Sequence, residues 1–204
     1  MSELNLARLD EFCDAWLNRA AAVPQPSIAD LFDQFFALWI VFNRIYEESA
    51  RVLAASGHPS ARVVVAIGKG RRFAPPPDRK SATVGVEALC GVAELRRRLY
   101  EDAESARAIE RVLDVVASGR LHLHENYETG EPDFPRDQKL VAEARQGSPR
   151  ALLELLYQAR CNLFHGQKAY SEVQRPLLEG MIRVLRIVID TARVKLRERH
   201  RAGA

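Results

Sequence analysis

The sequence predicts an all-α protein, a bundle of five to seven helices around one core. Apolar residues recur at spacings of three and four over most of the 204 residues, as on one face of an α-helix. Helix-capping residues and prolines separate these segments. Apolar residues make up 47% of the chain and charged residues 28%, which is ordinary for a globular domain and excludes wholesale disorder.

Two helices are predicted in the N-terminal quarter of the chain. The first covers about 4–21 and ends before two prolines. Ser27 is followed three residues later by Asp30, a pattern that resembles a capping box. This pair opens a long second helix over about 27–55, whose apolar and aromatic residues lie largely on one side.

The middle of the chain contains the one segment with a β-like composition. Residues 62–67 read Arg-Val-Val-Val-Ala-Ile, which fits a strand or a buried turn of helix, and the sequence alone leaves both open. Glycines and three consecutive prolines then predict a loop over 68–78. A short β-hairpin is expected near 62–67 or near 120–128.

The C-terminal half is predicted to be helical except for one polar loop near 118–136. Ser148 followed by Pro149 is a typical helix start, and Gly166 is well placed as the residue that ends that helix. We therefore expect one domain, 1–204, with a basic loop near 68–82, the polar loop, and a basic C-terminal tail. The further helices are expected over 82–100, 105–117, 137–146, 148–166 and 171–199.

Positive charge is concentrated in two places, although the net charge is only +3. Residues 183–201 hold seven Lys and Arg against two acids, and 68–82 hold five against Asp78. Clustered positive charge attracts polyanions such as nucleic acid. The alternative is that cations at the end of the last helix favour the helix dipole and keep an exposed tail solvated.

Several classes of protein are excluded. The longest apolar run has eight residues, far below the roughly twenty of a membrane span, and no secretion signal is evident, so we expect a cytoplasmic protein without membrane contact. Three scattered cysteines exclude a disulfide framework and favour buried thiols. No P-loop, zincin or dinucleotide motif occurs, and no cofactor or metal is expected. His122, His124 and Glu125 could alternate as metal ligands but fit an exposed loop better.

The segment with the most chemical potential ends the helix that begins at Ser148. Its core stripe is expected to be Leu152, Leu156, Ala159 and Leu163. On an ideal helix Arg160 lies about 80° to one side of Leu152, and Asn162 and His165 lie about 80° and 140° to the other. Arg160 and His165 can therefore meet only through a distorted last turn or across two copies of the helix.

The sequence Arg160-Cys-Asn-Leu-Phe-His165 resembles the signature of the HEPN superfamily, an Arg, four to six residues and a His near a helix end. His165-Gly166 matches a common form of it. Residues 35–46, which include Asn43, look like the aromatic, Asn-bearing helix found early in several members. Many active members place a polar residue directly after the Arg, whereas here Cys161 intervenes before Asn162.

This resemblance implies a metal-independent endoribonuclease that often works as a homodimer. It implies Arg160, His165 and Asn162 as catalytic residues, RNA as substrate, and a toxin–antitoxin or phage-defence setting with an antitoxin protein as partner. The residue types suit this chemistry, because imidazole transfers protons near neutral pH and guanidinium binds phosphate oxygens. Since the 2′-hydroxyl of RNA is the nucleophile, no metal is needed.

Further residues could bind the substrate. Lys168, Lys69, Arg71 and Arg72 could extend a track for phosphates, and Asn43 either ties two helices together or reaches the Arg160 end. The alternatives are a non-catalytic HEPN-like module that binds RNA, a nucleotide or a partner protein, and a purely structural helical dimer. A lone His before a capping Gly also fits an ordinary helix end.

Overall fold

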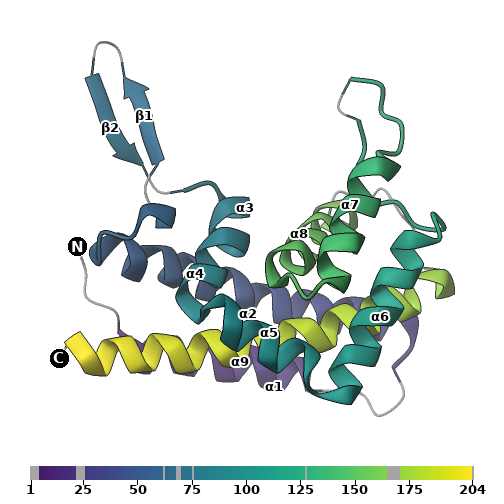
Figure 1. Cartoon of the computed structure of the whole chain (residues 1–204). Helices are drawn as coiled ribbons and strands as arrows, with labels where there is room; N and C mark the ends of the chain where they lie inside the picture. The colour runs from purple at the N-terminus through teal and green to yellow at the C-terminus, as the bar shows by residue number, and fades with distance from the viewer. Residues whose placement is uncertain are drawn as a thin grey trace.

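The computed structural model describes residues 5–21, 26–61, 63–67, 70–74, 76–126, 128–164 and 171–203, with the backbone alone for 63–67, 70–74 and 164. The fold is all-α, as predicted (Figure 1). The helices are α1 (Leu6–Ala20), α2 (Ile28–Ala55), α3 (Asp78–Lys80), α4 (Val86–Cys90), α5 (Val92–Tyr100), α6 (Ala103–Ala117), α7 (Phe134–Arg145), α8 (Pro149–Phe164) and α9 (Arg175–Gly203), with short 3₁₀ turns at Pro59–Ala61 and Glu172–Gln174.

The predicted start signals of two helices are confirmed. Ser27 and Asp30 form a capping box at the start of α2, since the Asp30 amide donates to Ser27 and the Ser27 amide donates to Asp30. The amide of Ala151 donates to Ser148 Oγ at 3.3 Å at the start of α8. Both helices begin where these local side-chain contacts satisfy free backbone amides.

The number of helices exceeds the expectation by one. A π-helical turn at Ser81–Gly85 joins α3 and α4 into one continuous helix, so the described residues form eight helices. Gly91 accounts for the difference, because its φ of 84° ends α4 and starts α5 where one helix over 82–100 was predicted.

The expected β-hairpin lies at the first of its two predicted positions. Strand β1 (Val63–Ile67) pairs antiparallel with β2 (Gly70–Ala74), from Val63 opposite Ala74 to Ile67 opposite Gly70. The prediction of a loop near 68–82 was therefore wrong over most of its span, because 70–74 pair with β1 and a helix begins at Asp78. The hairpin projects from the helical body (Figure 1).

Helix α2 is the centre of the core. It packs against α1 and α9 on one side and against the π turn of 81–85 on another. Its aromatic side chains are among the most deeply buried in the structure, and they belong to one contiguous apolar cluster with residues of the other helices. None of the helices in the described part of the chain combines the length and apolar content of a membrane span.

Helices α6 and α9 approach each other closely at Gly180. A Cβ atom built at this glycine would lie 2.3 Å from Val112 Cγ2 and 2.7 Å from the carbonyl oxygen of Ala108. Both distances are below any normal contact, and the second involves backbone that cannot move aside easily. The absence of a side chain at Gly180 therefore sets the distance between these two long helices.

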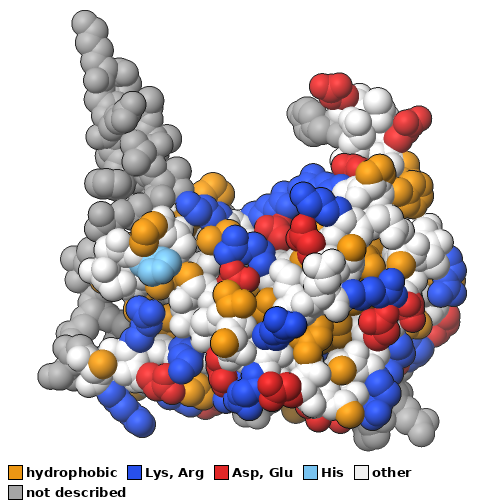
Figure 2. Space-filling view, viewed as in Figure 1, with side chains coloured by type: hydrophobic (Ala, Val, Ile, Leu, Met, Phe, Trp, Pro, Cys, Tyr) orange, Lys and Arg blue, Asp and Glu red, His pale blue; other side chains and the backbone are white. Residues whose placement is uncertain are grey.

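Ion pairs join the C-terminal half of α9 to α1. Arg193 pairs with Asp10 and Asp14, each at 2.8 Å, and Arg197 pairs with Asp10 at 2.7 Å. Two more basic residues in 183–201 are also paired, Arg183 with Asp102 and Glu104, and Lys195 with Glu198. Basic and acidic side chains alternate over the face shown in Figure 2. Much of the basic tail therefore holds helices together.

We predict that Gly180→Ala destabilises the protein by roughly 1–3 kcal/mol, the usual cost of overpacking. At an exposed helix position, alanine normally stabilises the protein relative to glycine by about 1 kcal/mol. A loss of stability in Gly180→Ala would therefore show that the added methyl group does not fit. Urea denaturation measures the change. Gly85→Ala is the control, because a Cβ there meets only the Lys80 carbonyl oxygen at an ordinary 3.6 Å. Equal stability of the two variants would contradict the close approach.

We predict an acid-labile contribution to stability from Asp10. Burial alone would raise the pKa of Asp10, but hydrogen bonds from Arg197 and Arg193 outweigh it and hold the pKa below its ordinary 3.8. Because the pKa of Asp10 is lower in the folded state, its ionised form stabilises the fold at pH values above 3.8. This stabilisation is lost as the pH falls through the pKa of the folded state. Asp10→Asn should therefore cost about 1 kcal/mol at pH 7 and progressively less below pH 4, as measured by urea denaturation across pH.

Candidate functional site

Two ion pairs fix α8 against the helix that runs through α3 and α4. Arg79 Nε lies 2.6 Å from Glu154 Oε2, and Arg150 pairs with the buried carboxylate of Glu87. The π turn of 81–85 lies between them and contacts both α2 and α8. Helix α8 is thus held at two points along its N-terminal half.

The π turn brings Arg79 and Glu87 to the same face of their helix, the face that meets α8. Arg79 and Glu87 are eight residues apart, which on a regular α-helix would separate them by about 80°. A π turn absorbs one extra residue, so their separation falls to about 20°. Their partners Glu154 and Arg150 are four residues apart on α8 and also share a face. The two pairs can therefore form together.

Arg160 lies near the end of α8 with its guanidinium over an indole ring. Its Cζ atom is 5.5 Å from the centroid of the Trp39 ring in the middle of α2. One of its nitrogens also lies 4.0 Å from the sulfur of Cys161. The side chain is half-buried, and Trp39 beneath it is fully buried. This contact fixes the position of the cation at the edge of the core.

Polar and aromatic groups from three elements surround Arg160. The Tyr157 ring stands edge-on to Trp39 at 6.0 Å. The Tyr46 hydroxyl donates to Asn43 Oδ1, whose amide nitrogen donates to Glu47 at 3.3 Å. Burial raises the pKa values of Tyr46 and Tyr157, and nearby negative charge on Asp78 adds to this while Arg160 opposes it. Both described hydrogen bonds of Asn43 are thus made within α2, four residues after Trp39.

Asn162 lies on the opposite flank of α8, as the helical geometry predicted. Its Nδ2 donates to the carbonyl oxygen of Leu123 at 2.8 Å, and its Oδ1 accepts from Gln158 at 3.1 Å. The residue is buried. The expected core stripe of α8 is also buried at Leu152, Leu156 and Ala159 and partly buried at Leu163. Asn162 and Arg160 therefore contact different parts of the protein.

The Asn162 contact leads to a buried His–Asp pair. His124 Nδ1 lies 2.7 Å from Asp137 Oδ1, and the amides of Leu123 and His124 donate to Asp137 Oδ2. His124 is 2% exposed and Asp137 is 1% exposed. The expectation of an exposed loop at His124 was therefore wrong, because Asp137 at the start of α7 draws this part of the loop inward. His122, by contrast, remains near the surface beside Glu125.

The structure places the remaining predicted residues only in part. Arg71 and Arg72 lie on β2 of the projecting hairpin. His165, Lys168 and Lys69 fall outside the described residues. Of the predicted site residues on α8, Arg160 therefore lies on one flank and Asn162 on the other, while Asn43 forms its hydrogen bonds within α2. Cys161 is half-buried rather than fully buried as expected, whereas Cys13 and Cys90 are buried.

Sequence reasoning missed the residues that hold Arg160 and those that hold the loop. Trp39 and Tyr157 look like ordinary members of apolar helix faces, and no local signal marks them as partners of an arginine. The pair of His124 and Asp137 had a weak signal, a histidine followed thirteen residues later by an acid in the first turn of a predicted helix.

The described site can bind an anion but holds no cluster for a metal ion. Arg160 supplies a permanent positive charge, with the phenols of Tyr157 and Tyr46 near enough to interact with it electrostatically. Among the residues that the structure describes, no group of three or more His, Cys, Asp or Glu side chains could hold a metal ion. No protein-family model, curated protein or solved structure matches the chain.

We predict that Asp137→Ala destabilises the protein by roughly 3–5 kcal/mol, because it leaves the buried His124 and two amides without their acceptor. Chemical denaturation monitored by circular dichroism measures this. Glu125→Gln is the matched control, since it removes the carboxylate from the His–acid pair at the surface. Its effect should stay below about 1 kcal/mol. A mild effect of Asp137→Ala, similar to the control, would show that the buried pair does not hold the loop.

Proposed function

We propose that the protein is a HEPN-like, metal-independent endoribonuclease in which Arg160 and His165 act on the scissile phosphate of RNA. The observation that supports this best is the placement of Arg160. Its guanidinium is held over Trp39, half-buried, five positions before the histidine of the Arg-x₄-His pattern. A cation fixed in a partly dehydrated position stabilises developing negative charge more strongly than a mobile one in water.

The proposed reaction is a transesterification within the RNA. The 2′-oxygen attacks the phosphorus atom as imidazole takes the 2′-hydroxyl proton, and the bond from phosphorus to the 5′-oxygen breaks. An imidazolium donates a proton to the departing 5′-oxygen. The products are a 2′,3′-cyclic phosphate and a 5′-hydroxyl. Arg160 binds the nonbridging phosphate oxygens, whose charge increases in the transition state.

A homodimer would supply the second proton-transferring group. One imidazole cannot be both base and acid in the same step, whereas two copies of α8 bring two histidines to one phosphate. A dimer would also allow Arg160 of one protomer and His165 of the other to share a phosphate, which a single regular helix does not. A partner protein that covers Arg160 would act as an antitoxin, in the toxin–antitoxin or phage-defence setting that the resemblance implies.

The other predicted residues have supporting roles in this proposal. Asn162 acts on the loop through Leu123 rather than on the phosphate, because both ends of its amide are already hydrogen-bonded. Asn43 holds Tyr46 and Glu47 on α2, one turn after Trp39, since both ends of its amide are hydrogen-bonded as well. Arg71 and Arg72 on β2, together with Lys69 and Lys168, would bind phosphates farther along the RNA strand, which predicts strong dependence of binding on salt.

We predict that Arg160→Ala lowers the cleavage rate of single-stranded RNA by roughly 10²–10³-fold, and His165→Ala by roughly 10²–10⁴-fold. The assay is run in EDTA with a fluorescent oligonucleotide, and the ends are identified by mass spectrometry as 2′,3′-cyclic phosphate. An oligonucleotide with a single 2′-deoxy position at the cut should resist cleavage there.

Arg107→Ala is the matched control, since it removes an exposed arginine from α6. It should leave the rate unchanged, and circular dichroism should show that all variants are folded. If RNA binds in a salt-sensitive manner and no product forms, the non-catalytic module is the correct reading. Wild-type rates for both Arg160→Ala and His165→Ala would remove these residues from the mechanism.

A further inference from the structure

The hairpin of β1 and β2 has no cover within the described part of the chain. The two strands pair with each other, neither packs along a helix, and the hairpin projects from the helical body (Figure 1). Strand β1 is apolar at all five positions, so both of its faces are apolar. A lone two-stranded hairpin is only marginally stable in water, and its outer edges carry unpaired backbone groups. These features indicate that another surface covers the hairpin.

The hairpin segment is also strongly basic. Residues 59–77 contain no acid and four basic residues, Arg62, Lys69, Arg71 and Arg72. Arg71 pairs with Ala66 and Arg72 with Val65 in the register of the strands. Because consecutive strand residues belong to opposite faces, each face of the hairpin carries one of these arginines. Two such hairpins placed edge to edge would repel each other, so the covering surface is expected to be acidic.

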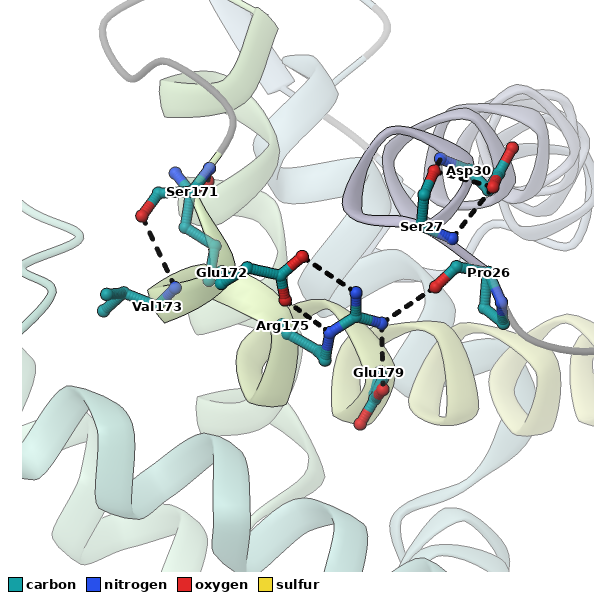
Figure 3. A network of polar contacts seen from close by, with 9 residues as sticks. Pro26, Ser27, Asp30, Ser171, Glu172, Val173, Arg175 and Glu179 are labelled. Carbon is teal, nitrogen blue, oxygen red and sulfur yellow. Dashed lines mark hydrogen bonds and ion pairs between the residues drawn. The ribbon is translucent and has the colours of Figure 1, made fainter.

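One segment of the same chain has the opposite charge. Residues 121–135, here called the acidic loop, contain no Lys or Arg and four acids, Glu125, Glu128, Glu131 and Asp133. Glu128 and Glu131 are exposed, and neither carboxylate has a hydrogen bond or ion pair with any residue that the structure describes. Arg175, by contrast, is engaged within the chain, since it pairs with two glutamates and donates to the carbonyl oxygen of Pro26 (Figure 3). Two carboxylates of the acidic loop are thus available to a partner.

The acidic loop is held in a defined shape. The amide of Asn126 donates to the carbonyl oxygen of Glu131 at 2.7 Å, and the amide of Gly130 donates to that of Asn126 at 2.8 Å. The buried pair of His124 and Asp137 fixes the base of the loop.

An exposed aromatic residue lies beside the acidic loop. Phe134 is 41% exposed, and its ring stands edge-on to the ring of His122 at 6.3 Å. Figure 2 shows acidic side chains toward the tip of this projection and apolar side chains at its base. The projection therefore combines negative charge with apolar surface, which matches the basic and apolar composition of the hairpin segment.

The hairpin and the acidic loop do not meet within one chain. They rise from the same side of the helical body and stand apart in the view of Figure 1, with α3 and α8 between them. A two-fold rotation about an axis perpendicular to that view places the hairpin of one copy beside the acidic loop of another. The reverse contact forms at the same time, because a two-fold interface repeats each contact. One symmetric dimer therefore covers both segments of both copies.

We propose that the hairpin of each protomer docks on the acidic loop of a second copy of this chain. The apolar hairpin covers the surface around Phe134, and the positive charge of residues 59–77 balances the negative charge of the acidic loop. The same arrangement turns the side of the body that carries α8 toward the second copy. The inference rests on the proposed function only for the need to bring two copies of α8 together, whereas charge and placement carry the contact itself.

RNA is the competing partner for the hairpin, since phosphates would also attract Arg71 and Arg72. RNA would repel the acidic loop and leave it uncovered, however, and it gives no reason for an apolar β1. A second copy accounts for both segments. Because Arg71 and Arg72 belong to opposite faces of the hairpin, one face of the docked hairpin remains available to RNA.

Charge reversal in two variants tests the contact by sedimentation velocity on RNA-free protein. One variant combines Glu128→Arg with Glu131→Arg, and the other combines Arg71→Glu with Arg72→Glu. Each variant alone places like charges at both contacts, so its dimer should be at least about tenfold weaker than that of the wild type. An equimolar mixture of the two variants should form a 1:1 heterodimer with an affinity close to that of the wild type, because opposite charges meet again at both contacts.

Two further variants complete the test. Glu128→Gln with Glu131→Gln removes charge but no described contact of the fold, and it should also weaken the dimer, which tests the contact independently of the hairpin variant. Glu11→Arg is the control, because Glu11 is an exposed acid of α1, on the opposite side of the body (Figure 1). It should dimerise as the wild type does.

The proposal would be overturned by a wild-type chain that stays monomeric at high micromolar concentration, by an unchanged dimer in the Glu128 and Glu131 variants, or by folded charge-reversal variants that form no heterodimer. Loss of RNA binding with an unchanged dimer in Arg71→Glu with Arg72→Glu would assign the hairpin to RNA and overturn it as well. A wild-type dimer that behaves as expected but cleaves no RNA would support this contact and contradict only the ribonuclease proposal.

Discussion

The burial of α2 is the constraint on which the rest of the fold depends. This helix is apolar at consecutive positions in its middle, such as Leu38 with Trp39 and Val41 with Phe42, and all four side chains are buried. A helix that is apolar on more than one face must be covered on more than one side. The covering elements are α1, α9, and the π turn with α4, and α8 adds Tyr157 and Arg160 at Trp39.

The same constraint creates the candidate site. Where α8 reaches the middle of α2, an arginine rather than an aliphatic residue meets the Trp39 ring. The site is thus the edge of the core, where the cover of α2 changes from apolar to charged. On the opposite flank of α8, Asn162 makes the corresponding contact with the loop before α7. Helix α8 is therefore fixed on both flanks, so a charge near its last turn is held in place without a metal or a disulfide in the described residues.

The helices were largely predictable from the sequence because their signals are local. Ser27 with Asp30, and Ser148 with Pro149, cap helices through contacts within four residues, and such contacts are visible in the sequence. What the sequence hid depends on distant partners. The π turn packs against α2 and α8, and the contact of Arg160 with Trp39 joins two separate segments. The positions of Arg160 and Asn162 on opposite flanks of α8 were predictable from helical angles alone. The inward position of His124 was not, because it depends on the contact with Asp137.

The π turn at Ser81–Gly85 also determines where the chain can change its length. The π turn holds one residue more than a regular helical turn, and Arg79 and Glu87 on either side of it still face Glu154 and Arg150. Removal of one residue here would give a regular α-helix with the same facing ends. Related chains that lack one residue between Arg79 and Glu87 would thus retain the attachment of α8, whereas chains with one residue more would turn one of these ends away from its partner.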